Sequence, residues 1–179
     1  MIRQAVILAG GQGTRLGELT RQIAKPVIEV AGEPFLGHLL WNLGRQGIRD
    51  LVLAVGHRHE TVRAAIGAGH RWGVKVDYVL ETQPLGTGGG LRHCAPLLQD
   101  EFLVLNGDSL FDINYLDLAL QLKKGQEGAL ALRWLEDSGR YGAVRLQGET
   151  IRGFAEKGGR GAGAINGGVY VCRRSLLDR

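Results

Sequence analysis

Cysteine is scarce in this sequence, and long apolar runs are missing. Its 179 residues include two cysteines, Cys94 and Cys172, which lie in apolar surroundings without the spacing of metal ligands. We therefore expect reduced core thiols in a reducing compartment, and no cysteine metal site. The opening apolar run is short and leads directly into a glycine loop, so it fits neither a signal peptide nor a membrane span. These features predict a cytoplasmic protein with no membrane partner.

Basic runs and aromatic clusters are also missing. Aromatic residues make up 6% of the chain, and its formal net charge of +4 comes from scattered Lys and Arg residues. Nucleic-acid-binding proteins usually concentrate basic residues, so we expect no nucleic-acid partner. A mildly basic surface suits small anionic substrates equally well. The length is sufficient for one domain with a sizeable core, and the sequence is compatible with a homo-oligomer.

Glycine, in contrast, is abundant, with 29 residues and no regular period. Usage above the average of about 7% indicates many tight turns and close backbone approaches. Apolar patterns between the turns alternate between strand and helix, and strands dominate the last third. We expect a short extended piece at 27–30 and strands at 4–8, 51–55, 74–80, 102–105, 129–135, 143–146, 151–155 and 165–172. We expect helices at 34–46, 60–66, 85–98 and 115–124.

This order of elements predicts an α/β fold: a sandwich with a mainly parallel sheet, followed by a strand-rich extension that closes one side of a cleft. Ligands in such sheets bind beyond the carboxyl ends of the strands. Three polar loops, 10–16, 84–90 and 106–109, leave strands or enter helices at that edge. We therefore expect the three loops to share one cleft.

The first of these loops follows a buried strand and contains three glycines in four positions. Because glycine has no side chain to keep a ligand away from the backbone, the N–H groups of this loop could turn toward an anion such as a triphosphate. Thr14 adds a hydroxyl donor, and Arg15 adds a planar fork suited to phosphate oxygens. The spacing matches neither the P-loop nor the Rossmann fingerprint. The glycines by themselves fit a tight turn between a strand and a helix equally well.

The other two loops offer a carboxylate and a second stretch of bare backbone. Asp108 follows an apolar strand and would suit a divalent cation bound to phosphates; the alternative is a turn capped by this side chain. The backbone around Thr87 would let a flat base lie against it, with Gln83 at the base edge; the alternative is a helix capped by Thr87. We expect Lys25 and Arg15 to form a clamp around the phosphates; the alternative is that both are solvated surface charges.

Taken together and in order along the chain, the motifs resemble those of the sugar-1-phosphate nucleotidylyltransferases, the enzymes that make nucleotide-diphosphate sugars. The matching segments are 10–16, 25–26, 84–89, 106–108, 141–142, 156–157 and 166–168. The resemblance implies the nucleotide-diphospho-sugar transferase fold, a Rossmann-like three-layer α/β/α sandwich with a mostly parallel mixed sheet. Within the family, the second glycine loop is most similar to D-glycero-α-D-manno-heptose 1-phosphate guanylyltransferases. This implies GTP and that heptose 1-phosphate as substrates and Mg²⁺ as cofactor.

The resemblance also implies a mechanism and a role for each matching residue. A sugar 1-phosphate oxygen would attack the α-phosphorus of the nucleotide in line, so catalysis would consist of positioning and charge neutralisation. Arg15 would stabilise the leaving pyrophosphate, Lys25 the reacting phosphates, and Asp108 the Mg²⁺. The residues implied to bind the nucleotide are Leu8, Ala9, Gly10, Gly11, Gly13, Thr14, Gln83, Gly86, Thr87, Gly88 and Asn106. Those implied to bind the sugar phosphate, each otherwise an ordinary hairpin end, are Tyr141, Gly142, Glu156, Lys157 and Asn166.

We expect one domain over 1–179, with a nucleotide-binding part at 1–125 and a sugar-phosphate-binding part at 126–179. The family usually supplies a second metal-binding Asp from a later strand, followed by helices. Because the sequence stops at Arg179, we expect the C-terminal end of this domain to be missing. Two alternatives stay open: a UTP- or dTTP-dependent transferase acting on a hexose or N-acetylmuramate 1-phosphate, and a non-catalytic module that binds nucleotide sugars. The missing Asp favours the module, and the two cations of the clamp favour an enzyme.

Overall fold

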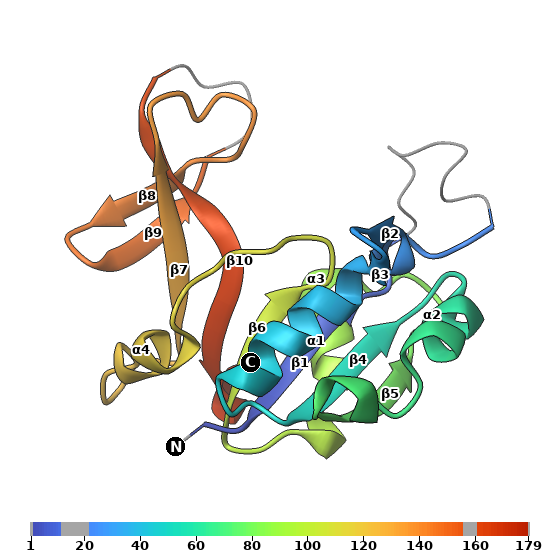
Figure 1. The fold of residues 1–179 in the computed structure, drawn as a ribbon. Helices are drawn as coiled ribbons and strands as arrows, with labels where there is room; N and C mark the ends of the chain where they lie inside the picture. The colour runs from blue at the N-terminus through green and yellow to red at the C-terminus, as the bar shows by residue number, and fades with distance from the viewer. Residues whose placement is uncertain (1, 12–21, 156–160, 179) are drawn as a thin grey trace.

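Short apolar runs form a six-stranded sheet that passes through the molecule (Figure 1). The structure is a computed structural model that describes residues 2–11, 22–155 and 161–178. Its strands, in the spatial order β5-β4-β1-β6-β10-β7, are Lys75–Leu80, Asp50–Val55, Gln4–Ala9, Glu101–Asn106, Gly163–Arg173 and Gly128–Leu135. The first four run parallel, and β10 runs antiparallel to both β6 and β7. The expected mostly parallel mixed sheet is confirmed.

Strands of the parallel half send alternate side chains to opposite faces of the sheet, and both faces are buried. On β1, Ile7 packs in a core with three helices, α1, α2 and α4, whereas Val6 packs on the other face with Leu91 of α3. The helices are α1 (Phe35–Arg45), α2 (His59–Ile66), α3 (Gly86–His93) and α4 (Tyr115–Leu120). Figure 1 shows α1 in front of the sheet and α3 behind it. The expected three-layer sandwich is confirmed.

Helix α1 forms where apolar residues repeat at helical spacing. Leu36, Leu39, Leu40 and Leu43 are fully buried in the core on that face of the sheet. After the helix, Gly47 has a φ of +84°, a left-handed conformation that glycine adopts without strain. The helix expected at 34–46 is therefore confirmed to within one residue at each end.

Two other expected helices were predicted too long. The helix expected at 85–98 stops at His93, because Pro96 cannot donate the hydrogen bond that a continuing helix needs. The helix expected at 115–124 stops at Leu120, and a turn containing Gly125, with a φ of +85°, follows it. Four 3-10 turns complete the helical elements of the described ranges: η2 (Lys25–Val27), η3 (His70–Trp72), η4 (Ala95–Leu97) and η5 (Arg174–Asp178).

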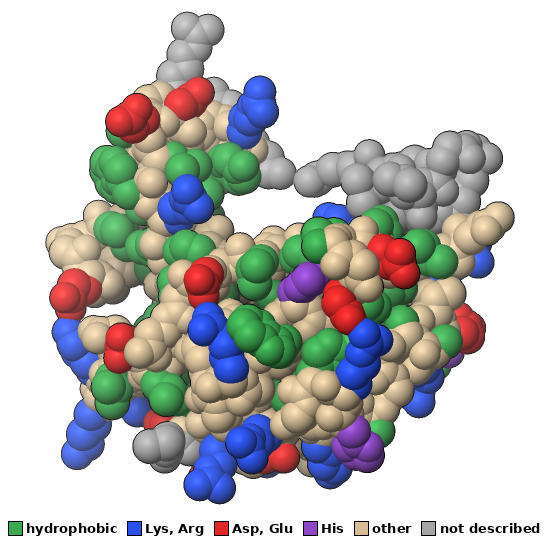
Figure 2. All heavy atoms as spheres, viewed as in Figure 1, with side chains coloured by type: hydrophobic (Ala, Val, Ile, Leu, Met, Phe, Trp, Pro, Cys, Tyr) green, Lys and Arg blue, Asp and Glu red, His purple; other side chains and the backbone are tan. Residues whose placement is uncertain are grey.

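The strand-rich part of the chain forms an arm that projects from the sandwich. It consists of the upper ends of β7 and β10 and the hairpin of β8 (Val144–Gln147) and β9 (Thr150–Phe154). A bridge between Ala143 and Ile165 joins the hairpin to β10. Figure 2 shows a hollow between this arm and the rest of the molecule. The extended piece expected at 27–30 begins with the last residue of η2 and continues into the short β2 (Glu29–Val30), which pairs with β3 (Glu33–Pro34).

A buried hydrogen bond links α1 to α4 and predicts a measurable loss of stability. The Tyr115 side chain is fully buried, and its hydroxyl accepts a 2.9 Å hydrogen bond from the Asn42 amide. Tyr115→Phe would leave that buried donor without this acceptor, so we expect the free energy of unfolding to fall by about 1–3 kcal/mol. Urea denaturation measures the change, with Tyr141→Phe, at a half-exposed tyrosine, as the control. Equal effects of the two substitutions would contradict the prediction.

Candidate functional site

The end of β1 and the end of β6 bring two of the polar loops together. Leu8 and Asn106 are register partners in the two parallel strands, so the residues that follow each strand emerge side by side. The Gly107 amide donates a 2.9 Å hydrogen bond to the Leu8 carbonyl. A Cβ on Gly107 would lie 2.8 Å from that carbonyl oxygen, so glycine is required for this approach. Asp108 is thereby held next to the first glycine loop.

This close approach gives a prediction for Gly107→Ala. Because the added methyl group would meet backbone rather than a movable side chain, the ends of β1 and β6 must separate. We expect the free energy of unfolding to fall by about 1–3 kcal/mol, the usual cost of overpacking. Gly11→Ala is the matched control for stability, since its Cβ would have no atom of the described residues within 4 Å. Denaturant unfolding of both variants is the measurement, and an unchanged midpoint for Gly107→Ala would refute the expectation.

A cavity of about 570 Å³ lies at this edge of the sheet, with residues of all three polar loops in its walls. Its lining is Leu8, Gly10, Gly11, Glu81, Pro84, Gly86, Thr87, Asn106 and Asp108. A second cavity, of about 460 Å³, shares Gly10, Glu81 and Pro84 with the first. Gln83 lines this second cavity, together with residues 56–59. The loops expected to share one cleft therefore do so in the described part of the chain.

Lys25 and Asp108 form an ion pair at the cavity edge. The Lys25 ammonium donates a 2.6 Å hydrogen bond to Asp108 Oδ2, and the Ser109 hydroxyl donates one of 3.2 Å to Oδ1. Partial burial, the largest single influence, raises the pKa of the Asp108 carboxyl. The hydrogen bond and charge of Lys25, together with the hydrogen bonds from Ser109 and the backbone, nevertheless hold this pKa below its usual value. The carboxylate is therefore ionised at neutral pH and partly neutralised by the ammonium.

The second glycine loop opens helix α3 with unoccupied backbone donors. Leu85 is the N-cap, and among the residues that the structure describes no side chain donates or accepts a capping hydrogen bond there, so the alternative in which Thr87 caps the helix is wrong. Gly86 has a φ of +70°, and a Cβ on Gly86 or Gly88 would meet no atom within 4 Å. The start of α3 thus presents free N–H groups next to open space.

Glu81 is a cleft residue that the sequence reasoning missed. It is the first residue after β5, as Asp108 is the second residue after β6, and it lines both cavities. The signal that could have found it is this position at the carboxyl end of a parallel strand. A single glutamate after a strand, however, is usually a solvated surface residue.

The residues predicted to bind the sugar phosphate are less concentrated at the cavity than those predicted to bind the nucleotide. The Asn166 amide donates a 2.6 Å hydrogen bond to the Tyr170 hydroxyl, and Asn166 Oδ1 accepts one of 2.7 Å from the Gly168 amide, within an irregular stretch of β10. A Cβ on Gly168 would lie 2.9 Å from Asn106 Nδ2, so this stretch borders the cavity. Tyr141, Gly142 and Asn166 do not line it, and Ala9 is buried in the core. The proposed residues outside the described ranges are Gly13, Thr14, Arg15, Glu156 and Lys157.

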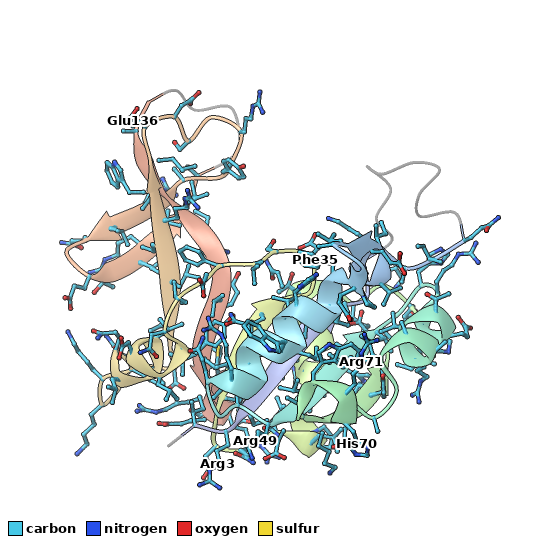
Figure 3. The ribbon with its side chains drawn as sticks, in the orientation of Figure 1. Arg3, Phe35, Arg49, His70, Arg71 and Glu136 are labelled. Atoms are coloured by element: carbon cyan, nitrogen blue, oxygen red, sulfur yellow. The ribbon has the colours of Figure 1, made fainter. Side chains whose placement is uncertain are left out.

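Three basic residues lie away from this site. Arg3, Arg49 and His70 lie where β1, β4 and β5 begin, at the edge of the sheet opposite the cavity (Figure 3). Within residues 2–11, 22–155 and 161–178, no three His, Cys, Asp or Glu side chains gather as metal ligands. The helices in these ranges also lack the length and apolar character needed to cross a membrane.

The chain was compared with known families, proteins and structures, and all three comparisons found similar proteins. Residues 4–179 match the family described as "Nucleotidyl transferase". Over 98% of its length the chain is 36% identical to D-glycero-alpha-D-manno-heptose 1-phosphate guanylyltransferase of Campylobacter jejuni, covering 78% of that protein. It is 35% identical to mannose-1-phosphate guanyltransferase of Gibberella zeae, again over 98% of the chain but 51% of that protein. The crystal structure of HddC from Yersinia pseudotuberculosis complexed with GMP-PN has a TM-score of 0.88 and 28% identity, with 99% of this chain and 79% of that one covered.

Proposed function

Because the chain belongs to the nucleotidyl transferase family, we propose that it transfers a guanylyl group from GTP to D-glycero-α-D-manno-heptose 1-phosphate. The observation that carries the proposal is the cavity of about 570 Å³ in which both glycine loops and Asp108 meet. The name of the Campylobacter jejuni relative supports the heptose and the guanine base. The GMP-PN complex of HddC supports a guanine nucleotide independently.

In the proposed reaction, an oxygen of the sugar 1-phosphate attacks the α-phosphorus of GTP in line. A bond forms between that oxygen and phosphorus, the bond to the bridging oxygen breaks, and pyrophosphate leaves with the electron pair. No side chain becomes covalently attached, so the protein contributes orientation and charge neutralisation. The uncapped start of α3 and the bare glycine backbone suit this task, since both offer fixed N–H donors without side-chain obstruction.

Two cations would neutralise the phosphates. Arg15 is assigned to the leaving pyrophosphate, because the loop that carries it continues from Gly10 and Gly11 in the cavity wall. Lys25 is assigned to the reacting phosphates, and the support is its ammonium group at the cavity edge, 2.6 Å from Asp108. In the absence of substrate, the pairing with Asp108 would neutralise the Lys25 ammonium and hold it in place. The nucleotide phosphates, which carry more negative charge, would then replace the carboxylate as its partner.

A divalent cation, which we propose to be Mg²⁺, fits the chemistry of Asp108. This carboxylate is ionised and lines the cavity, and each of its oxygens accepts one hydrogen bond, from Lys25 or Ser109, and keeps a further lone pair that suits a hard cation. Bound there, the ion would offset the negative charge of the nucleotide phosphates. Asp108 would hold it, and Lys25 would turn from the carboxylate to the phosphates.

The sugar phosphate is assigned to the part of the domain formed by 126–179, and the nucleotide to 1–125. Tyr141, Gly142 and Asn166 belong to the arm, with Glu156 and Lys157 assigned to the same group. Support comes from the contact between the irregular stretch of β10 and Asn106, which brings the base of the arm to the cavity. We also propose a cytoplasmic location, in keeping with two free, buried cysteines.

A pyrophosphate-release assay tests the function. GTP, UTP, dTTP and CTP are each combined with the 1-phosphates of D-glycero-D-manno-heptose, mannose, glucose and N-acetylmuramate in the presence of Mg²⁺. We expect turnover with GTP and the heptose 1-phosphate. Mannose 1-phosphate is the second candidate, favoured by the Gibberella zeae relative. Turnover with UTP or dTTP alone would overturn the choice of base, and binding of a nucleotide sugar without turnover under any condition would favour the non-catalytic module.

A further inference from the structure

We propose that the Thr61 hydroxyl positions the Lys25 ammonium for the reacting phosphates, by holding the backbone of Ala24 at the start of η2. The inference rests on the proposed function, because it names a positioning residue for the lysine of that reaction. Thr61 lies on α2 and belongs to none of the sequence motifs.

The Thr61 hydroxyl joins two backbone segments. It accepts a 3.0 Å hydrogen bond from the Ala24 amide and donates one of 2.8 Å to the Arg58 carbonyl. Ala24 is buried and is the N-cap of η2, so its amide cannot be paired within the turn. Thr61, 37 positions further along the chain, supplies the acceptor that this buried donor needs.

The other end of this hydrogen-bond chain lies next to the cavity wall. Arg58 has a φ of +58°, an uncommon conformation for a residue other than glycine, and its carbonyl accepts hydrogen bonds from both the amide and the hydroxyl of Thr61. Two residues earlier, Gly56 approaches the first glycine loop so closely that a Cβ would lie 2.9 Å from the Gly10 carbonyl oxygen. Thr61 therefore ties η2 to a segment that itself contacts the cavity wall.

The Ala24 backbone determines where the Lys25 ammonium lies. The Ala24 carbonyl accepts a 3.0 Å hydrogen bond from the Val27 amide, and the Lys25 carbonyl accepts one of 3.2 Å from the Ile28 amide, so the turn moves as a unit. The ammonium is at the end of a flexible four-carbon stem, so a small rotation of the turn displaces it by a larger distance. Its 2.6 Å contact with Asp108 Oδ2 therefore requires a fixed orientation of the turn.

Apolar packing keeps the turn near α2 but does not set its orientation. Ala24 and Val27 are buried in the same core as Val62, the residue after Thr61. Burial of this kind is non-directional, whereas a hydrogen bond has a preferred angle. Removal of the hydroxyl should therefore leave the fold intact and change the placement of Lys25.

Three substitutions test the inference. Thr61→Val keeps the size and branching of the side chain but removes the hydroxyl. Thr61→Ser keeps the hydroxyl and loses the methyl group. Tyr78→Phe is the matched control, because it removes a 2.6 Å hydrogen bond from a side chain to the Gly67 carbonyl, at the other end of α2. Urea denaturation measures the stability of each variant.

The first measurement needs no substrate. The rate at which acetic anhydride modifies the Lys25 amine is measured by mass spectrometry and divided by the rate for Lys75, whose ammonium pairs with Asp77 on β5. An amine that has left its carboxylate reacts faster, so we expect this ratio to rise about two- to fivefold in Thr61→Val, the range expected from exposed ion pairs. Thr61→Ser and Tyr78→Phe should keep the wild-type ratio.

The second measurement is a double-mutant cycle with Lys25→Met in the pyrophosphate-release assay. We expect Thr61→Val to lower kcat about 10-fold with a smaller effect on KM, because the positive charge is kept but misplaced. In the Lys25→Met background the same substitution should lower kcat by less than about twofold, since no ammonium is left to position. Thr61→Ser should retain most of the wild-type kcat.

The outcomes separate this inference from the proposed function. An equal loss of kcat with and without Lys25, or an unchanged acetylation ratio in Thr61→Val, would overturn the positioning role and leave the function standing. A rise of the ratio in Tyr78→Phe as large as in Thr61→Val would also overturn it. A wild type without turnover, in which Thr61→Val alone raises the acetylation ratio, would support the placement of Lys25 by Thr61 and refute the proposed activity.

A second hydroxyl-free variant, Thr61→Ala, guards against a local clash of the valine methyl group with the Ala24 amide. It should reproduce the acetylation ratio and the kcat of Thr61→Val. Loss of folding in both hydroxyl-free variants, with Thr61→Ser still folded, would overturn the inference in favour of a purely structural role.

Discussion

Asp108→Asn is expected to lower kcat about 100- to 1000-fold with GTP and the sugar 1-phosphate. The substitution keeps the shape of the side chain but removes the negative charge that would hold the divalent cation at the cavity. Transition-state charge left without such stabilisation typically costs two to three orders of magnitude in rate. Steady-state pyrophosphate release as a function of Mg²⁺ concentration is the measurement, and higher Mg²⁺ should restore only part of the activity.

The fold should tolerate this substitution. The side chains of Asp108 and Lys25 are 45% and 34% exposed, and ion pairs at such positions contribute little to stability. Asp112→Asn is the control, because Asp112 lies four residues further along the same loop and forms its own exposed ion pair with Arg45 at 3.2 Å. Full activity in Asp108→Asn would remove this residue from the mechanism, and a similar loss in Asp112→Asn would show that loop structure, not charge, is responsible.

Much of the sandwich was predictable because its central strands are buried on both faces. β1, β4 and β6 are continuous apolar runs for this reason, and such runs are visible without knowledge of their partners. The shared cleft followed from the rule that ligands lie beyond the carboxyl ends of parallel strands. The positions of Gly10 and Asp108 in one cavity wall bear this out within the described residues.

What the sequence left undetermined depends on contacts between distant residues. Lys25 and Asp108 are 83 positions apart, and their contact depends on the η2 turn, which the sequence analysis did not predict. Glu81 became visible as a cleft residue only once Gly10 and Gly90 were placed around its carboxyl group. Periodicity describes which face of an element is buried, and it does not show which side chains meet across a cleft.

An irregularity in β10 limited what the sequence could show about the arm. The motif beginning at Asn166 looked like the interruption of a strand, and in the structure it is a shift of register inside β10 between Asn166 and Tyr170. Its glycines fit there because a Cβ on Gly167 would overlap the Phe111 ring and one on Gly168 would crowd Asn106. A register shift is set by these neighbours from other elements, so the motif alone could not place it.

Lys25→Met is the second substitution with a large expected effect. It preserves the length and apolar stem of the side chain but removes the ammonium that pairs with Asp108 and is assigned to the phosphates. We expect kcat to fall about 100-fold, since one positioned charge is lost from the reacting centre. Pyrophosphate release is the measurement. Lys75→Met, which removes an exposed lysine paired with Asp77 at 3.3 Å, should leave the rate unchanged.

The same variant should also change the titration of Asp108. In the wild type, burial raises the pKa of Asp108, but Lys25, with smaller contributions from Ser109 and a backbone hydrogen bond, holds it below its usual value. The carboxylate therefore stabilises the fold above its unfolded-state pKa, and this stabilisation is lost as the pH falls through the folded-state pKa. Without Lys25, burial becomes the larger influence and the pKa rises, so protonation begins at higher pH. Carboxyl ¹³C NMR of the metal-free protein measures the pKa of Asp108, and an unchanged pKa in Lys25→Met would show that the ion pair does not persist in solution.

Because both substitutions act on one charge pair, Lys25→Met combined with Asp108→Asn should slow the reaction by less than the product of the separate effects.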